Sequence, residues 1–146
     1  MKWLKNELWP RIRARLPEAR VDVYGAYPSR EMMALTDPAS GFHVRGPAPG
    51  EAGDTLARYR VNLAPLRFGA GIKGKIAEGW RVGTPVASTP IGAEGMTGGR
   101  PFGGLIAGDP EGFAEAAVRL HQDRSTWDGA ATAGRRIVRE LFSLEI

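Results

Sequence analysis

Short apolar runs alternate with longer amphipathic segments along this chain. Five runs are rich in apolar residues and give way to glycine or proline, as strands do where a loop begins. They cover residues 21–25, 42–46, 60–65, 84–89 and 104–108. The segments predicted to be helical lie near 30–35, 54–59, 72–82, 109–124 and 127–142. This alternation predicts an α/β fold: an open, Rossmann-like parallel sheet with helices on both faces.

The helix after the last predicted strand has the clearest start. Asp109 is a good N-cap, and Pro110 suits the first helical position. The positions that follow at spacings of three and four are Phe113, Ala117, Leu120 and Arg124. This spacing predicts an amphipathic helix with one face on the core.

Residues 1–16 also have a helical pattern, with an expected bend at Pro10. The apolar positions of this segment are Trp3, Leu4, Leu8, Trp9 and Ile12. Packing against the sheet is the commoner fate of such a helix. A basic helix with two tryptophans also suits a membrane surface, so peripheral membrane contact is the alternative. A doubly wound fold normally begins with a strand, and no predicted strand precedes this helix.

Composition narrows the function classes only a little. The chain has 146 residues, no cysteine and a formal net charge of +4. This length suits a single domain over residues 1–146, and the lack of cysteine and of a secretory signal suits the cytoplasm. The basic excess favours a phosphate-bearing ligand, or it is a solvated arginine-rich surface. Aromatic residues do not interleave with the arginines, so nucleic-acid binding is not predicted.

A glycine-rich loop at residues 63–76, "LAPLRFGAGIKGKI", partly matches two phosphate-binding motifs. The P-loop pattern fails because Ile76 stands where a hydroxyl would hold Mg²⁺. The dinucleotide pattern G-x-G-x-x-G is present, but three residues separate it from the strand, whereas the first glycine of that motif follows directly. Neither motif explains the loop.

The start of the following helix offers a simpler anion site. Gly71 allows close approach of the backbone, and a helix beginning near Ile72 directs unpaired N–H groups outward. Lys73 and Lys75 place cations at this same end, which is unfavourable for the helix dipole unless an anion is bound. The pattern therefore favours phosphate binding.

Helical geometry adds a carboxylate to this end of the helix. At about 100° per residue, Gly71, Lys75 and Glu78 share one face, and an apolar face lies opposite. A carboxylate one turn below a phosphate site can accept hydrogen bonds from ribose hydroxyls. The alternative is a surface pair between Lys75 and Glu78.

The segment "LAPLRFGAGIKGKIAEGWRVGTPVASTPIGAEGM" resembles the nucleotide-sugar-binding region of family 4 glycosyltransferases, the retaining enzymes of GT-B architecture. The flanks "WLKNELWPRIRARLPEARVDVYGAYPS" and "FHVRG" are similar to the first helix and the next strands of their C-terminal domain. The resemblance implies transfer of a hexose from a nucleotide sugar, most simply a UDP- or GDP-sugar, without a metal or other cofactor. The acceptor, a glycan, lipid or protein, is left open.

The same resemblance implies a role for each residue of the loop. Gly71 and Ile72 would offer backbone amides to the diphosphate. Lys75 would contact phosphate, assisted by Lys73 or Arg67. These residues and amides would stabilise the departing diphosphate.

Further positions follow from the same match. Glu78 matches the second glutamate of the family's E-x7-E motif, which is expected on the ribose. The first glutamate, which usually contacts the sugar, is replaced by Ala70, so sugar selection departs from the family pattern. Gly25 and Gly46 end strands whose rims would flank the base.

The family's first strand and acceptor-binding domain would lie upstream of Met1. We therefore expect this chain alone to bind a nucleotide sugar weakly and to transfer nothing. The first strand would sit between residues 21–25 and 60–65. Without it, either these strands close the gap, another chain fills it by association, or the fold is marginally stable.

Two other interpretations are open at this point. The chain could be a nucleotide- or NAD-binding domain of another doubly wound enzyme. It could also be a non-catalytic glycosyltransferase-like subunit that serves as a partner surface.

Overall fold

The computed structural model describes residues 1–68 and 73–142, apart from the side chain of Ala52. Helices and strands alternate along the chain, as predicted. The strands are β1 (Val21–Tyr24), β2 (Phe42–Gly46), β3 (Asn62–Ala64), β4 (Val86–Ser88) and β5 (Gly104–Ile106). The helices are α1 (Trp9–Arg15), α2 (Arg30–Met33), α3 (Ala52–Leu56), α4 (Gly74–Arg81), α5 (Pro90–Ala93), α6 (Pro110–Gln122) and α7 (Arg124–Ile137). Two π-helical turns, η1 (Leu4–Leu8) and η3 (Val138–Phe142), and a 3₁₀ turn, η2 (Pro38–Ser40), complete the described elements.

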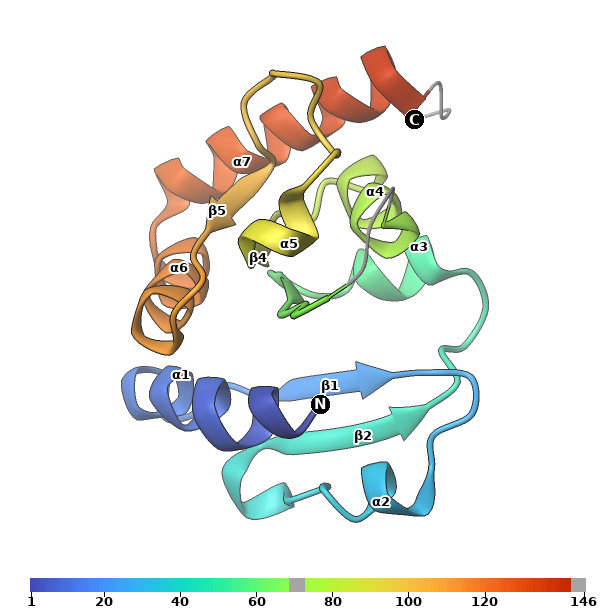
Figure 1. Ribbon diagram of the computed structural model, residues 1–146, viewed down its shortest axis with the longest axis vertical. Coiled ribbons are helices and arrows are strands. Elements are labelled where there is room, and N and C mark those ends of the chain that lie inside the picture. Colours follow the sequence, from blue (N-terminus) through green and yellow to red (C-terminus); the bar gives the residue numbers. More distant parts are fainter. Residues whose placement is uncertain (69–72, 143–146) are drawn as a thin grey trace.

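The strands form two parallel sheets, and β1 does not pair with β3 in the described part of the chain. One sheet has the order β1-β2 and the other β3-β4-β5. Figure 1 shows β1 and β2 together at one end of the molecule, with β4 and β5 beyond them. The α/β class with parallel strands and flanking helices is therefore confirmed. Of the three outcomes left open above, closure of β1 onto β3 is not found among the described residues.

The N-terminal helix buries its apolar side. Leu4, Leu8, Trp9 and Ile12 are all buried in one core cluster, which also contains Phe113 of α6. Instead of a simple bend at Pro10, the chain makes the π-helical turn η1 immediately before α1. A proline lacks the N–H that an α-helical turn needs, and the wider turn accommodates this loss. The apolar residues of this helix therefore pack on the core, as predicted.

A second core cluster surrounds Trp80 of α4. Its ring is fully buried and its Nε1 donates a hydrogen bond to the Gly103 carbonyl at 2.8 Å. The ring also meets Phe102 edge-on, with 5.2 Å between centroids. The other buried members are Ala64, Ile76, Ala77, Val86, Met96, Ile137 and Val138. This cluster fixes α4 between the larger sheet and α7.

Most predicted boundaries agree with the structure within a few residues. Asp109 caps α6 by accepting a hydrogen bond from the Gly112 N–H at 3.1 Å, as its sequence suggests. Arg124, which we assigned to the same helix, instead begins α7 and is exposed. Asp123 separates the two helices and caps the second.

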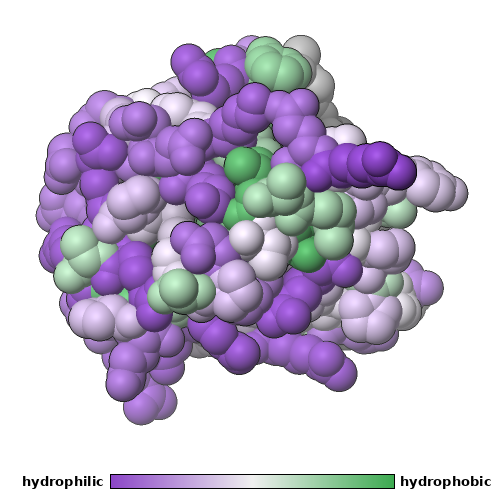
Figure 2. Space-filling model, turned by 90° about the horizontal axis from the view of Figure 1, so that it is seen from below, coloured by the Kyte–Doolittle hydropathy of each residue, from purple (hydrophilic) through white to green (hydrophobic). Residues whose placement is uncertain are grey.

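The surface is mostly hydrophilic on the face shown in Figure 2, with a small hydrophobic area near its centre. Among the described residues, no helix combines the length and apolar character needed to cross a bilayer.

Candidate functional site

The carboxyl ends of β3 and β4 lie where helices α4 and α5 begin, and this rim holds the predicted site. In open α/β sheets, ligands bind beyond the carboxyl ends of strands, near helix N-termini. Gly71 and Ile72, which we expected to offer amides here, lie outside the described residues. The site is therefore built below from Arg67, Lys73, Lys75 and Glu78.

Helix α4 begins without a side-chain cap. Lys73 occupies the N-cap position in an extended conformation, and its side chain makes no capping hydrogen bond. Its carbonyl oxygen accepts hydrogen bonds from the N–H groups of Ile76 and Ala77, at N···O distances of 3.1 and 3.2 Å. The amides of Gly74 and Lys75 make no hydrogen bond to the described residues, as expected for a first helical turn. This end of α4 thus presents N–H groups that can donate hydrogen bonds to an anion.

Lys75 is exposed in the first turn of α4, and the opposite face of the helix is buried. Ile76, Ala77 and Trp80 are 5 % exposed or less. The predicted division of this helix into a polar and an apolar face is confirmed for the described residues. The ammonium group of Lys75 makes no ion pair with any described residue and lies on the exposed face of the helix.

Glu78 is half-buried one turn deeper in α4 and is held by Arg81. Its Oε2 lies 3.2 Å from Nη2 of Arg81, and the side chain of Glu78 is 36 % exposed. Within the described residues Glu78 makes no ion pair with Lys75. The surface pair between Lys75 and Glu78, weighed as an alternative, is thus not formed.

Helix α3 approaches this ion pair closely at Gly53. A Cβ atom on Gly53 would lie 2.5 Å from Nη2 of Arg81 and 3.2 Å from Oε2 of Glu78. Sequence reasoning singled out neither Gly53 nor Arg81. The spacing of three between Glu78 and Arg81 was a signal for their pairing.

The other two predicted cations have partners within the protein. Nζ of Lys73 donates to the Glu94 carbonyl at 3.3 Å, which ties the start of α4 to the loop after α5. The guanidinium of Arg67 lies over the ring of Trp3, with Cζ 5.3 Å from the centroid. In this structure Lys75 is therefore better placed than Lys73 or Arg67 to meet a ligand.

Gly25 and Gly46 lie side by side at the carboxyl ends of β1 and β2. The Gly25 N–H donates to the Gly46 carbonyl at 2.8 Å. Gly46 has a φ of +84°, a backbone conformation that residues with a side chain rarely adopt, so glycine is needed here for the turn of the chain. The loop after β1 carries Tyr27, whose side chain is 96 % exposed and which sequence reasoning missed.

A polar cluster lies on one face of β1, in the sheet that β1 and β2 form. The Tyr59 hydroxyl donates a hydrogen bond to Asp22, and the two hydroxyls of Tyr24 and Tyr59 are 2.7 Å apart. Arg45 of β2 donates to Asp22 at 3.0 Å, and the Asp22 side chain is only 8 % exposed.

These contacts shift two pKa values. Burial alone would raise the pKa of Asp22, but the hydrogen bonds from Tyr59 and Arg45 outweigh it and lower the pKa below its usual value. Burial, and then the hydrogen bond to Asp22, raise the pKa of Tyr59. Asp22 is therefore an ionised, fully engaged carboxylate that stabilises the sheet.

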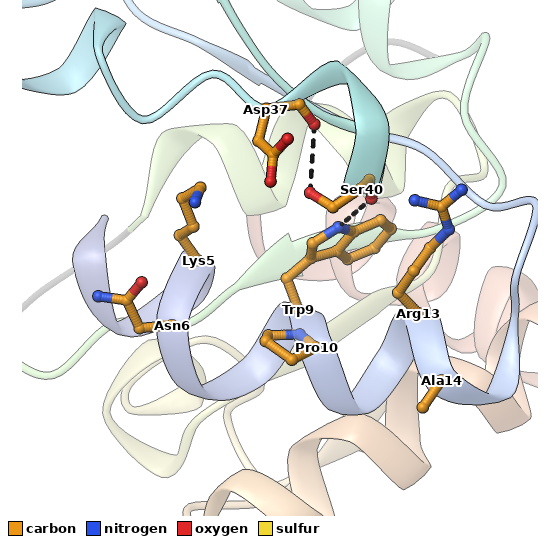
Figure 3. A pocket seen from close by; sticks show the side chains of 8 residues that line it. All are labelled: Lys5, Asn6, Trp9, Pro10, Arg13, Ala14, Asp37 and Ser40. Carbon is orange, nitrogen blue, oxygen red and sulfur yellow. Dashed lines mark hydrogen bonds between the residues drawn. The ribbon is translucent and has the colours of Figure 1, made fainter.

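Two surface hollows lie at the opposite end of the strands from the rim. The first is formed by α1 and η2, as Figure 3 shows, and two of its side chains donate hydrogen bonds to backbone carbonyls. Nε1 of Trp9 donates to the Ser40 carbonyl at 2.7 Å, and Nε of Arg13 donates to the Pro17 carbonyl at 2.6 Å. The second lies between residues 15–19 and His121. Both lie at the amino ends of strands, whereas ligands of open α/β sheets bind beyond the carboxyl ends.

The described residues contain no group of three or more histidine, cysteine or carboxylate side chains that could hold a metal ion.

Comparison with protein families identifies the class to which this rim and fold belong. Residues 1–123 match the family described as Glycosyl transferases group 1. The match covers most of the chain, so the protein belongs to the group 1 glycosyl transferases. A comparison with curated proteins finds no match to this chain.

Proposed function

We propose that the rim at the start of α4 binds the diphosphate and ribose of a nucleotide sugar, most simply a UDP- or GDP-hexose. The main support for this proposal is the order of groups along α4. The uncapped amides of the first turn come first, then the exposed Lys75, and then the half-buried Glu78 one turn deeper. Membership of the group 1 glycosyl transferases supports a sugar nucleotide over other anions.

Within this proposal, Lys75 and the helix amides hold the phosphates. By the sequence resemblance, Gly71 and Ile72, which lie outside the described residues, would add two further amides. The positive end of the helix dipole favours a dianion at this position. Glu78 accepts hydrogen bonds from the ribose, with Arg81 and Gly53 fixing the direction of its carboxylate.

The reaction we propose is transfer of a hexose to an acceptor with retention at the anomeric carbon, carried out together with an acceptor-binding domain, since we expect this chain alone to transfer nothing. As the bond from the sugar to the diphosphate breaks, negative charge grows on the phosphate oxygens. Lys75 and the first-turn amides of α4 stabilise this charge, the task that a metal ion performs in other phosphate sites. The family 4 assignment, the C-terminal placement of the domain and the lack of a metal rest on the sequence resemblance. The proposed cytoplasmic location rests on the lack of cysteine and of a secretory signal.

Calorimetric titration of the chain with UDP, GDP and NAD tests the proposal. We expect one of the two nucleoside diphosphates to bind, weakly, and NAD not to bind. Tight NAD binding without either diphosphate would instead favour the domain of another doubly wound enzyme.

A further inference from the structure

Thr89 links the end of β3 to α5 through three hydrogen bonds. Its N–H donates to the Ala64 carbonyl at 3.2 Å, and its hydroxyl group donates to the Leu66 carbonyl at 2.5 Å. The same hydroxyl oxygen accepts a hydrogen bond from the Gly92 N–H at 3.2 Å, which makes Thr89 the N-cap of α5. Thr89 is only 4 % exposed. Because its hydroxyl group is buried and already both donates and accepts, it holds the chain rather than a ligand.

The chain just beyond α5 holds the start of α4. Nζ of Lys73 donates to the Glu94 carbonyl, and the Lys73 N–H donates to Sδ of Met96, each at 3.3 Å. Met96 is fully buried in the cluster around Trp80, so its sulfur is a fixed point. Lys73 is the N-cap residue of α4. The place where α4 begins therefore depends on residues that follow α5.

The helix between these two sets of contacts is short and tightly packed. It has a single turn, in which the Ala93 N–H donates to the Thr89 carbonyl at 3.1 Å. A Cβ atom on Gly92 would overlap Oγ of Ser88 and would lie 3.3 Å from the Ala64 carbonyl oxygen. Helix α5 therefore rests directly on the carboxyl ends of β3 and β4.

Both residues that are held in this way belong to the glycine-rich loop at residues 63–76. Thr89 holds Leu66 on the β3 side, and the chain beyond α5 holds Lys73 on the α4 side. We call residues 89–96 the brace, because they connect these two points. Groups that are fixed before a ligand arrives lose less conformational entropy when it binds, so they bind it more tightly.

We propose that Thr89 is a positioning residue of the nucleotide site and acts through the brace. This inference rests on the proposed function, because it assumes that the start of α4 receives the diphosphate. Thr89 fixes Leu66 directly. As the cap of the single turn of α5, it also steadies the chain that holds Lys73, and with it the first-turn amides of α4.

Replacement of Thr89 by valine tests this role, because valine keeps the branched shape and lacks the hydroxyl group. We expect Thr89→Val to weaken binding of UDP or GDP, whichever the unsubstituted chain binds, by about tenfold. Inorganic pyrophosphate should lose as much, because the brace acts at the phosphate end of the site. Thr89→Ser keeps the hydroxyl group and should restore nucleotide affinity to within about twofold. Calorimetric titration measures all of these affinities.

Thr36→Val is the matched control for the loss of a threonine hydroxyl group. Oγ1 of Thr36 accepts a hydrogen bond from the Val44 N–H at 3.0 Å, on β2 of the other sheet. Both valine variants should unfold at a lower temperature than the unsubstituted chain, because each leaves backbone groups without their partner. Only Thr89→Val should lose nucleotide affinity.

A second variant tests the other end of the brace. Met96→Leu removes the sulfur that accepts from the Lys73 N–H and nearly conserves the side-chain volume, so the core should tolerate it. We expect it to weaken nucleotide binding by about threefold, since a thioether is a weak acceptor. If Thr89→Val does not fold, Met96→Leu decides the question.

The possible failures of the two proposals can be told apart. Equal nucleotide affinities of Thr89→Val and Thr36→Val, or no recovery in Thr89→Ser, would overturn the positioning role and leave the proposed function intact. Where Thr89→Val does not fold, an unchanged affinity of Met96→Leu would overturn it. An unsubstituted chain that binds neither UDP nor GDP would overturn the proposed function, and this inference with it.

Discussion

Oε2 of Glu78 accepts a hydrogen bond from Nη2 of Arg81 at 3.2 Å, at the point where Gly53 brings α3 against α4. The other carboxylate oxygen of Glu78 makes no hydrogen bond to the described residues. The arrangement therefore holds the carboxylate in one direction while leaving an oxygen for a ligand hydroxyl.

Replacing Glu78 by glutamine should separate ribose binding from phosphate binding. We expect Glu78→Gln to weaken binding of UDP or GDP about tenfold, because a charged acceptor is exchanged for a neutral one. Binding of inorganic pyrophosphate, which has no ribose, should be unchanged. Parallel calorimetric titrations with the two ligands measure this. Equal losses for both ligands would show that Glu78 does not contact the ribose.

Removal of the Lys75 ammonium group should weaken binding of both the nucleotide and pyrophosphate. We expect Lys75→Ala to weaken nucleotide and pyrophosphate alike by about tenfold or more, since a charged hydrogen bond to phosphate contributes about 1.5–3 kcal/mol. Thermal stability should hardly change because the side chain is exposed. Arg119→Ala, an exposed cation on α6, is the matched control. A nucleotide affinity that is unaffected by Lys75→Ala would favour the non-catalytic partner subunit.

The hydrogen bond from Tyr59 to Asp22 should make stability depend on pH. It lowers the pKa of Asp22 in the folded state below the usual value of 3.8, so this stabilisation is present above about pH 4 and is lost as the pH falls through the folded pKa. We expect Tyr59→Phe to destabilise the protein by about 1–3 kcal/mol at pH 7.

The difference between Tyr59→Phe and the unsubstituted protein should shrink as the pH falls below about 4. Urea unfolding at several pH values measures it. The control Tyr27→Phe removes the same group, a tyrosine hydroxyl, from an almost fully exposed ring, so it should leave the free energy of unfolding unchanged. A Tyr59→Phe difference that stays constant down to low pH would show that the two groups are not coupled.

Two glycines of α7 should respond in opposite directions to alanine. A Cβ on Gly134 would lie 2.4 Å from Cδ1 of the buried Trp80, whereas one on Gly129 has nothing within 4 Å. We expect Gly134→Ala to destabilise by about 1–3 kcal/mol through overpacking. Gly129→Ala should stabilise by about 0.5–1 kcal/mol through helix propensity. Thermal unfolding of both variants tests this, and a stabilising Gly134→Ala would mean that Trp80 can move.

The sequence predicted the elements of this fold well because each carries its own local signal. The cap at Asp109, the apolar runs of the strands and the periodicity of α4 all depend on neighbouring residues in the chain. Arg124 was misplaced because its spacing continues the α6 pattern, and the capping role of Asp123 was not considered. The division into two sheets was not predicted, since strand pairing depends on residues far apart in sequence. The sequence left open closure of the strands, filling by another chain, and marginal stability.

The candidate site was predictable in part for the same reason. Lys75 and Glu78 lie on one helix, so their order along it follows from helical geometry. The contacts of Arg67 with Trp3 and of Gly53 with Arg81 join residues that are distant in sequence. Only tertiary structure could show that Arg67 already has an aromatic partner and that α3 orients Glu78.

Mapping a bound nucleotide onto the chain tests the central claim most directly. Amide and indole NMR signals are followed while UDP- or GDP-hexose is added to the full chain. We predict that the signals of Gly74, Lys75 and Glu78 shift, and that the Trp9 indole, in the hollow between α1 and η2, does not. Shifts at Trp9 and Ser40 with none along α4 would contradict the account.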